Sequence, residues 1–177
     1  MQRAWLIEAL DKRKHERGAF SCGKQPLDDY LKRTARKAQA GDTGRTWVAI
    51  DRDAATDDSG RRPVLGYYTV SMCSVDLTAL PEGRRSGLPR PQVPAALLGR
   101  LAVDRTAQGE GLGRALLIDA LRRMANAAEH VAAHAVVLDA IDEGAKRFYE
   151  QYGFLELADD PLHLFLPMDT VRQLLEA

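Results

Sequence analysis

The chain has 177 residues, of which 45% are hydrophobic, and its 25 Lys and Arg residues balance 25 Asp and Glu residues. This length is enough for one well-buried core and short for two ordinary domains, so a single domain over residues 1–177 is expected. The longest apolar runs fall far short of the roughly 20 residues of a membrane-spanning helix. The zero formal net charge argues against a protein that binds nucleic acid through bulk charge alone.

Apolar periodicity predicts an antiparallel region with one helix in the first part of the chain. Alternating apolar residues and β-branched or aromatic runs predict strands over 5–9, 47–50 and 64–75, the last two paired as a hairpin. Pro26, a residue typical of the first helical turn, opens a helix that is expected to run to about Gly41. Its inward stripe, with residues three and four positions apart, is Leu27, Tyr30, Leu31, Thr34, Ala35 and Ala38.

The second part of the chain alternates strands and helices. Residues 80–94 contain prolines and arginines without periodicity and predict an ordered surface loop. A buried-type strand over 96–103 leads through a glycine turn, 108–113, into a helix whose inward stripe is Leu112, Leu116, Ala120, Leu121 and Met124. The remaining predicted elements are a strand over 135–140, a helix over 143–152, a strand over 163–166 and a tail helix over 171–176. This order predicts a mixed α/β (α+β) fold.

Charge is unevenly distributed along the chain although it sums to zero. Residues 12–45 contain ten basic and four acidic side chains, a local net charge of +6, and Arg84, Arg85 and Arg90 form a second basic cluster. Residues 139–160 carry a local net charge of −5. The sequence therefore predicts an electrically polarised molecule.

Cysteine and histidine usage gives no sign of a metal site. Cys22 and Cys73 are far apart and form no C-x-x-C pair, so neither a disulfide framework nor a zinc site is indicated. His130 and His134 are four residues apart but lack the H-E-x-x-H pattern, and we expect no metal. The first ten residues do not resemble a secretory signal. A cytoplasmic protein without membrane segments is expected.

The most informative segment is Gln108-Gly-Glu-Gly-Leu-Gly-Arg114, where a buried strand turns into a helix. Glycines let backbone N–H groups approach a phosphate closely, and a helix N-terminus adds about half a positive charge. The Walker lysine is missing, and the turn follows a hairpin instead of opening a βαβ unit, which disfavours a P-loop and a Rossmann site. From the residues alone, a pyrophosphate site and close packing at a helix start remain two open interpretations.

Two motifs in the right order resemble those of the GNAT acetyltransferase superfamily. Gln108, Gly111 and Gly113 after a Leu-Ala-Val strand resemble its acetyl-CoA signature, and Phe148-Tyr149-Glu-Gln-Tyr-Gly153-Phe154 is similar to its Phe-Tyr-x-x-x-Gly-Phe segment. The resemblance covers about residues 4–168. It implies the GNAT fold, with a central mixed, mostly antiparallel β-sheet that is flanked by helices and splayed at the acetyl-CoA site.

The same resemblance implies roles for individual residues. Tyr149 would protonate the departing thiolate, a transfer between ordinary pKa values of about 10 and about 8.5. On residue type alone, core packing is the more frequent role of such a tyrosine, and the motif favours the catalytic one. Asp142 stands where many relatives carry Asn. The residues implied in acetyl-CoA binding are Leu101, Ala102, Val103, Gln108, Gly109, Gly111, Leu112, Gly113, Arg114, Asp139 and Ala140.

A narrower resemblance is to the acetyltransferase toxins of bacterial toxin–antitoxin pairs. It rests on Phe20-Ser-Cys22-Gly23, Leu27-Asp28-x-Tyr30-Leu31, Arg36, Arg45-Thr46, Leu98-Gly-Arg-Leu-Ala-Val-Asp104, Asp119-Ala120 and Ala145-Lys-Arg-Phe-Tyr149. It implies an N-acetyltransferase toxin that acetylates the α-amine of aminoacyl-tRNA and blocks translation. It also implies a ribbon-helix-helix antitoxin that neutralises the toxin and binds operator DNA. A homodimer is expected.

The acceptor is less defined by the sequence than the donor. No general base can be identified, which suits an α-amine of pKa about 8 better than a lysine of about 10.4. The residues expected to contact tRNA phosphates, for which a solvated charged face is the alternative, are Lys32, Arg33, Arg36, Lys37, Arg84, Arg85 and Arg90. Two other interpretations stay open: a GNAT that acetylates a small amine or a protein N-terminus, and a non-catalytic coenzyme A binding regulator.

Overall fold

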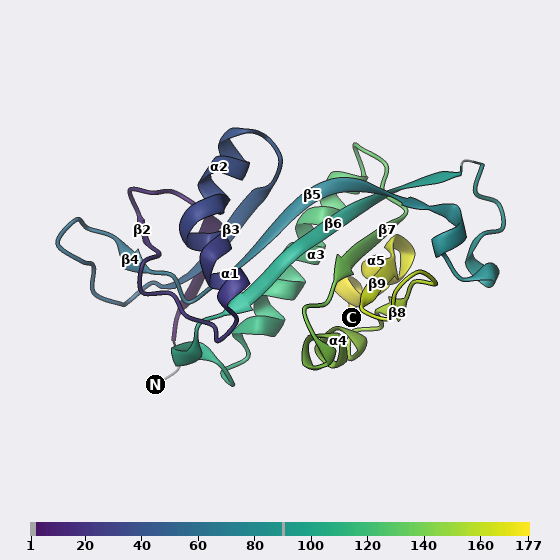
Figure 1. Cartoon of the computed structure of the whole chain (residues 1–177). Helices are drawn as coiled ribbons and strands as arrows, with labels where there is room; N and C mark the ends of the chain where they lie inside the picture. Colours follow the sequence, from purple (N-terminus) through teal and green to yellow (C-terminus); the bar gives the residue numbers. More distant parts are fainter. Residues whose placement is uncertain (1–2, 90) are drawn as a thin grey trace. The chain divides into compact units, whose positions relative to one another are not determined.

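The computed structural model describes residues 3–89 and 91–177, and within it the chain forms two compact units. One unit comprises Met1–Val70 and Arg100–Ala120, and the other comprises Ser71–Gly99 and Leu121–Ala177. Three long elements belong to both units: strand β5 (Gly66–Asp76), strand β6 (Gln92–Val103) and helix α3 (Leu112–Ala128) (Figure 1). The single domain expected from the chain length stays a prediction.

The strands form one seven-stranded sheet in the order β1-β3-β5-β6-β7-β9-β8. Its other strands are β1 (Trp5–Ala9), β3 (Arg45–Asp51), β7 (Ala135–Asp139), β8 (Leu155–Glu156) and β9 (His163–Pro167). The pairs β1–β3, β3–β5, β7–β9 and β8–β9 are antiparallel, whereas β6–β7 is parallel. The expected mixed, mostly antiparallel sheet is therefore confirmed, and so is the hairpin of the second and third predicted strands.

The parallel pair is short. Its register runs only from Ala95 opposite Ala135 to Leu97 opposite Val137, whereas β6 continues to Val103. The C-terminal half of β6 therefore lies beyond the parallel ladder, as expected for a sheet that opens between these two strands. A separate pair of two-residue strands, β2 (His15–Glu16) and β4 (Arg62–Pro63), was not predicted, because two residues carry no periodicity.

The predicted helix from Pro26 to Gly41 is present but is not a uniform α-helix. It consists of α1 (Gln25–Asp29), a π-helical segment η1 (Tyr30–Thr34) and α2 (Ala35–Ala40). The wider π-helical turn shifts the phase of the residues that follow it. For this reason Thr34, which was expected to face inward, is exposed, while Leu31 and Ala35 are completely buried.

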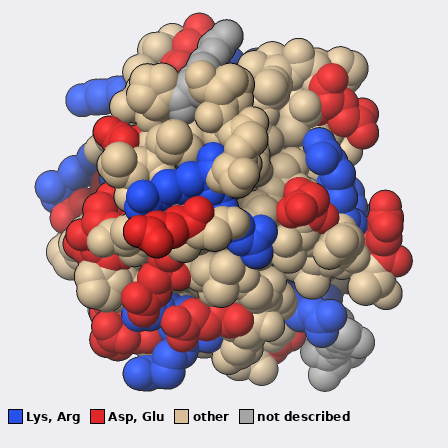
Figure 2. Space-filling model, turned by 90° about the vertical axis from the view of Figure 1, so that its right-hand side faces the viewer, with Lys and Arg blue, Asp and Glu red and all other residues tan. Residues whose placement is uncertain are grey.

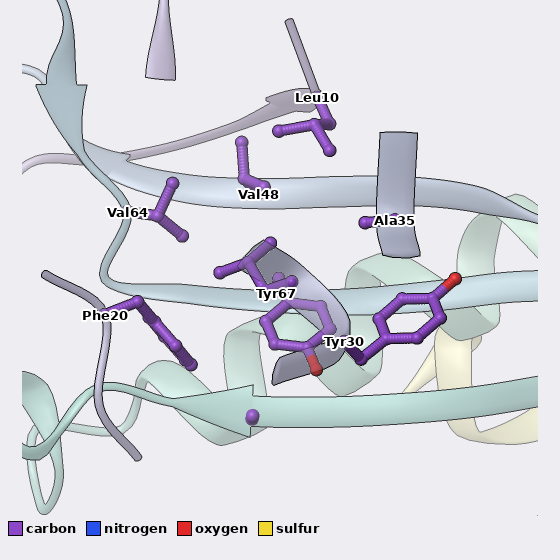
Figure 3. Close-up of a cluster of buried hydrophobic side chains, with 9 residues drawn as sticks. Leu10, Phe20, Tyr30, Ala35, Val48, Val64 and Tyr67 are labelled. Atoms are coloured by element: carbon purple, nitrogen blue, oxygen red, sulfur yellow. The ribbon is translucent and has the colours of Figure 1, made fainter. Parts of the chain in front are cut away.

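The core of the first unit lies between this helical segment and the sheet (Figure 3). The cluster consists of Leu10, Phe20, Tyr30, Leu31, Ala35, Val48, Val64, Tyr67 and Ala102. Tyr67 on β5 stacks on Tyr30 with ring centroids 6.2 Å apart, and its hydroxyl donates a 2.6 Å hydrogen bond to the carbonyl of Leu27. The tyrosine pair therefore fastens the helical segment to the middle of β5.

Helix α3 packs against β5 through its buried stripe. All five predicted inward residues of this helix are buried. Gly66, the first residue of β5, lets the helix approach: a Cβ built there would lie 2.7 Å from Leu116 Cδ1 and 3.2 Å from both the Ala102 carbonyl oxygen and Leu112 Cδ2. A side chain at position 66 has no room unless α3 moves.

The second unit has its own apolar core, formed by Val75, Ala79, Leu80, Val93, Ala95, Ala135, Val137, Leu157 and Phe165. Its helices are α4 (Glu143–Glu150) and α5 (Met168–Glu176), and an ion pair between Lys146 and Glu156 joins α4 to β8. Short 3-10 turns lie at η2 (Leu77–Ala79), η3 (Glu82–Arg84) and η4 (Arg105–Ala107). None of the described helices could cross a membrane.

Several predicted boundaries differ from the structure. The loop expected over residues 80–94 ends earlier, because β6 begins at Gln92 and includes two buried residues, Val93 and Ala95, that continue its apolar face. Helix α4 ends at Glu150 instead of residue 152, and α5 begins three residues before the expected start. Each shift is small compared with the length of the element and leaves the order of elements as predicted.

Replacing Gly66 by Ala should destabilise the protein by about 1–3 kcal/mol, because the added methyl group overlaps Leu116 and the Ala102 carbonyl. At roughly 2–4 °C per kcal/mol, the melting temperature should fall by roughly 2–12 °C. Thermal unfolding followed by circular dichroism measures this. Gly83→Ala is the matched control, because a Cβ there meets no atom within 4 Å and should change the stability by less than about 0.5 kcal/mol. An unchanged melting temperature for Gly66→Ala would contradict this packing.

Candidate active site

The C-terminal end of β6 is held by a buried carboxylate. Asp104 is 7% exposed, and its Oδ2 accepts a 2.9 Å hydrogen bond from the Ser21 amide. Its Oδ1 accepts hydrogen bonds from the Thr106 amide and hydroxyl, at 2.9 and 2.7 Å. The Arg105 amide returns a 2.9 Å bond to the Ser21 carbonyl. Asp104 therefore joins the end of β6 to the segment that precedes α1.

The turn after η4 has the backbone geometry of a phosphate-binding loop. Gly109 and Gly111 have φ values of +79° and +87°, in the left-handed region that favours glycine. A Cβ built on Gly109 would meet no atom within 4 Å, and both residues are exposed, so the turn is open on its outer side. Helix α3 begins directly after it at Leu112. The first N–H groups of a helix have no acceptor within the helix and favour an anion.

Gln108, expected among the acetyl-CoA residues, has a different environment from the glycines. Its side-chain amide donates to the carbonyls of Cys22 and Val103, at 3.0 and 2.9 Å. These two bonds use the amide nitrogen to brace the turn between β6 and the segment before α1. The side chain therefore positions the glycine turn in this structure.

The other residues expected in donor binding divide between the two units. In the first unit, Ala102 and Leu112 are buried, Leu101, Val103 and Gly113 are half-buried, and Arg114 is exposed. In the second unit, Asp139 is exposed at the end of β7 and Ala140 is buried. The Ala140 amide donates a 2.8 Å bond to the Leu162 carbonyl. Within the first unit, Gln108 holds the glycine turn next to the C-terminal end of β6, whereas Asp139 and Ala140 belong to the second unit.

Tyr149, the expected proton donor, belongs to the second unit and lies on α4. It is 7% exposed and packs edge-on against Phe148 and Phe154, with ring centroids 5.2 and 5.6 Å away. Burial raises the pKa of its phenol above the ordinary value, because removal from water disfavours the phenolate. Tyr149 is therefore a protonated, firmly packed hydroxyl at neutral pH. Its pKa is not near 10, as the ordinary value suggested.

Helix α4 begins directly after Asp142, for which the family resemblance suggests an Asn. Asp142 is the N-cap of α4, and its Oδ1 accepts a 2.8 Å hydrogen bond from the Ala145 amide. Aspartate and asparagine are both good N-caps, so the capping function survives the replacement. Gly144 lies in the first turn of the helix, where it is exposed.

The expected tRNA-binding residues differ in how exposed their side chains are and in whether they already bond to the protein. Arg36, Lys37 and Arg84 are exposed, Lys32 is half-buried, and Arg33 is exposed with its Nε 4.0 Å from the Asp29 carboxylate. Arg85 braces its own loop, because its guanidinium donates hydrogen bonds to the carbonyls of Leu80 and Thr78, at 2.8 and 2.9 Å. Arg90 lies outside the described residues. On the face in Figure 2, basic and acidic side chains are interspersed, without a continuous basic surface.

Cys22 lies in the segment that Asp104 and Gln108 hold. Burial and the neighbouring Asp28 carboxylate raise the pKa of its thiol to about 11. A thiol with this pKa is protonated at neutral pH and is a poor nucleophile. Within residues 3–89 and 91–177, no group of three or more His, Cys, Asp and Glu side chains is arranged to hold a metal ion.

Alkylation should detect the raised pKa of Cys22. In a Cys73→Ser variant, iodoacetamide at pH 8 should react with Cys22 at least about tenfold more slowly than with N-acetylcysteine, since fewer thiolates outweigh their greater individual nucleophilicity. The rate should keep rising until about pH 11. Unfolding the variant in urea is the control and should restore the rate of the small thiol. A folded protein that reacts as fast as N-acetylcysteine would show that the thiol is not protected.

A family model described as an acetyltransferase (GNAT) domain matches residues 42–156. The tRNA-acetylating toxin of Mycobacterium tuberculosis is 39% identical over 157 residues, which cover 89% of this chain and 89% of the relative. A probable toxin TacT of Sinorhizobium fredii is 34% identical over 180 residues, which cover 96% of this chain and 94% of the relative. Sequence similarity therefore extends over nearly the whole chain.

Solved structures of toxins share the fold. A tyrosine-to-phenylalanine mutant of KacT superposes with a TM-score of 0.88 at 28% identity, covering 98% of this chain and 99% of KacT. AtaT complexed with acetyl-methionyl-tRNAfMet gives a TM-score of 0.86 at 28% identity, covering 97% and 99%. An AtaT mutant bound to acetyl-CoA and to the C-terminus of the antitoxin AtaR gives 0.81 at 25% identity, covering 98% and 99%.

The matched domain, the two relatives and the sheet order agree with one another. The family model spans more than half of the chain, and both relatives exceed 30% identity over most of its length. The open glycine turn before α3 provides the backbone that an acetyl-CoA pyrophosphate requires. The chain belongs to the GNAT acetyltransferase family and, within it, to the toxin acetyltransferases, and it is an N-acetyltransferase that takes its acetyl group from acetyl-CoA.

Proposed function

We propose that this enzyme acetylates the α-amine of aminoacyl-tRNA and thereby blocks translation as the toxin of a toxin–antitoxin pair. The observation that carries the proposal is the similarity, over nearly the full chain, to a tRNA-acetylating toxin and to AtaT in its complex with acetyl-methionyl-tRNA. Acetylation removes the charge and the nucleophilicity of the amine that forms the next peptide bond, so an acetylated aminoacyl-tRNA cannot accept a growing chain.

In this proposal, different residues bind different parts of acetyl-CoA. The backbone of Gly109–Gly113 and the start of α3 hold the pyrophosphate of acetyl-CoA, while Gln108 keeps the turn in place. An N–H at the end of the Leu101–Val103 strand polarises the thioester carbonyl. Asp139 and Ala140, at the end of β7, contact the pantetheine arm. These roles follow from the resemblance to GNAT enzymes and are supported by the open turn.

The chemistry requires one attack and two proton movements. The neutral amine attacks the thioester carbon, the C–S bond breaks, and the coenzyme A thiolate takes the proton of the Tyr149 hydroxyl. The proton that the amine loses passes to the tyrosinate, directly or through water, so the enzyme is regenerated. The raised pKa of Tyr149 makes this transfer more demanding than ordinary values indicate. A thiolate that leaves in equally apolar surroundings has its own pKa raised by the same desolvation, which reduces the mismatch.

The acceptor site in the proposal relies on basic side chains. Lys32, Arg33, Arg36 and Lys37 share the helical segment over residues 25–40, and Arg36 and Lys37 are exposed. Phosphate contacts of this kind give affinity without base specificity. Arg84 is a second exposed cation that is suited to a phosphate, whereas the two carbonyl bonds of Arg85 reduce its freedom to contact RNA.

The toxin assignment also brings expected partners. The antitoxin is expected to be a ribbon-helix-helix protein that covers the basic side chains of the helical segment over residues 25–40 and binds operator DNA. AtaT, a structural relative, binds the C-terminus of its antitoxin AtaR, which supports an antitoxin for this chain. A homodimer and action in the cytoplasm, where charged tRNA is found, complete the proposal.

Labelled acetyl-CoA with total charged bacterial tRNA should transfer label to RNA, and mild deacylation should release that label together with the amino acid. Tyr149→Phe should lower kcat by about 10²–10⁴ with little change in either KM, because only the leaving group loses its proton donor. Tyr152→Phe is the matched control, since this half-buried tyrosine packs on Phe148 and has no chemical role in the proposal.

Different failures of this experiment have different meanings. Normal acetyl-CoA binding without any label on tRNA would indicate that the acceptor is a small amine or a protein N-terminus. Binding without turnover on any amine would indicate a coenzyme A binding regulator. Full activity of Tyr149→Phe would remove Tyr149 from the chemistry and leave it as a packing residue among Phe148 and Phe154.

Charge reversal on α2 should weaken the use of tRNA specifically. The double variant Arg36→Glu, Lys37→Glu should raise the KM for charged tRNA at least about tenfold in 150 mM salt, because two phosphate contacts become repulsive. The KM for acetyl-CoA should not change. The control, Arg52→Glu with Arg122→Glu, alters two exposed arginines elsewhere and changes the net charge equally. Unchanged kinetics of the α2 variant would exclude these two residues from the RNA contact.

A further inference from the structure

Arg100 is the one charged residue among the twelve residues of β6, whose neighbours are mostly apolar. Successive side chains of a strand point to opposite faces, so Arg100 shares a face with Ala102. Ala102 packs in the cluster under the helical segment, together with Tyr30 and Leu31. Arg100 therefore faces the side of the sheet that α1 and η1 cover, and Leu101 and Val103 face the other side.

The guanidinium of Arg100 is held in place by an aromatic ring. Its Cζ lies 3.7 Å from the centroid of the Tyr30 ring, the geometry of a cation–π contact. Tyr30 is 8% exposed and stacks on Tyr67, which is completely buried and bonded to the Leu27 carbonyl. Figure 3 shows the two tyrosine rings side by side in this cluster. The platform under Arg100 is thus rigid, and little side-chain entropy remains to be lost when the arginine binds a ligand.

This ordered cation has no anionic partner among the residues that the structure describes. Other arginines of the same unit pair with nearby carboxylates: Arg61 with Asp57 at 2.9 Å and Arg45 with Asp42 at 2.6 Å. Arg100 is exposed, and no carboxylate of the described residues lies within ion-pair distance of it. A preorganised, exposed and uncompensated guanidinium is the usual arrangement for binding a phosphate.

We propose that Arg100, positioned by Tyr30, binds a backbone phosphate at the 3′ end of aminoacyl-tRNA and so fixes the acceptor for acetylation. The inference rests on the proposed function. The amino acid is esterified to the 3′-terminal nucleotide, and the nearest anionic groups in the substrate are the phosphodiesters of that single strand. Coenzyme A also carries phosphates, but its pyrophosphate is assigned to the glycine turn at the start of α3.

The test compares two acceptors that carry the same amino acid: charged tRNA and the corresponding 3′-aminoacyl adenosine, which has no phosphate. In Arg100→Gln, the KM for charged tRNA should rise about tenfold. The KM for acetyl-CoA and the rate with aminoacyl adenosine should stay within about twofold of wild type. The slope of log affinity for tRNA against log salt should decrease in magnitude by about 0.7, the value for one single-strand phosphate contact.

Three further variants separate binding from folding. Arg100→Lys keeps the charge but loses the planar contact with the ring, so its KM for charged tRNA should lie between those of wild type and Arg100→Gln. Tyr30→Phe retains the ring and should behave as wild type, whereas Tyr30→Leu should raise the KM for charged tRNA. Circular dichroism melting of each variant identifies any loss of fold, which would lower activity with both acceptors equally.

Three results would overturn the inference. A rise in the KM for acetyl-CoA with an unchanged KM for tRNA would assign the phosphate contact to coenzyme A. Equal losses with charged tRNA and aminoacyl adenosine would make Arg100 a structural residue. An Arg100→Gln variant with wild-type kinetics would remove it from the site while leaving the proposed function intact. A wild-type enzyme that binds acetyl-CoA but never labels tRNA would instead overturn the proposed function, and this inference with it.

Discussion

The buried carboxylate of Asp104 is the interaction on which the arrangement of the first unit depends. A carboxylate that is 7% exposed must have its oxygens satisfied, and Asp104 achieves this with the Ser21 amide and with the amide and hydroxyl of Thr106. These bonds end β6 sharply and lead the chain into η4 and the glycine turn. They also fix the segment before α1. One side chain therefore determines the positions of both the glycine turn and the helical segment.

The tyrosine pair of Tyr30 and Tyr67 performs a comparable task at β5. Tyr67 fastens the helical segment to β5 through its ring and its hydroxyl, and Tyr30 carries the guanidinium of Arg100. One stack therefore joins the packing of the core to the position of an exposed arginine, the residue to which our inference assigns recognition of a phosphate. Because both aromatic rings are part of the core, the direction of the guanidinium is determined by the same contacts that stabilise the unit.

The two groups to which the proposed mechanism gives a role lie in opposite environments. The glycine turn over residues 108–113 is open and lies at the positively polarised start of α3, which suits a phosphate that stays partly in contact with water. Tyr149 is enclosed by aromatic side chains and its pKa is raised, so in the proposed mechanism it keeps its proton until the thiolate leaves. The carbonyl of Cys22, in contrast, accepts a hydrogen bond from Gln108 next to the glycine turn. Burial and Asp28 keep the Cys22 thiol protonated, so it contributes structure and no nucleophile.

The sequence by itself determined the order of the main elements, the apolar stripe of α3 and the position of the glycine turn, because periodicity and glycine spacing are local properties that survive tertiary packing. Only the tertiary structure revealed the π-helical turn that exposes Thr34, the two-residue strands, the use of Gln108 and Arg85 as braces, and the contact of Arg100 with Tyr30. A charged residue within an apolar strand was the available signal for Arg100. Its meaning depended on which ring lay opposite, 70 residues earlier in the chain, and no local pattern encodes a contact between residues so far apart.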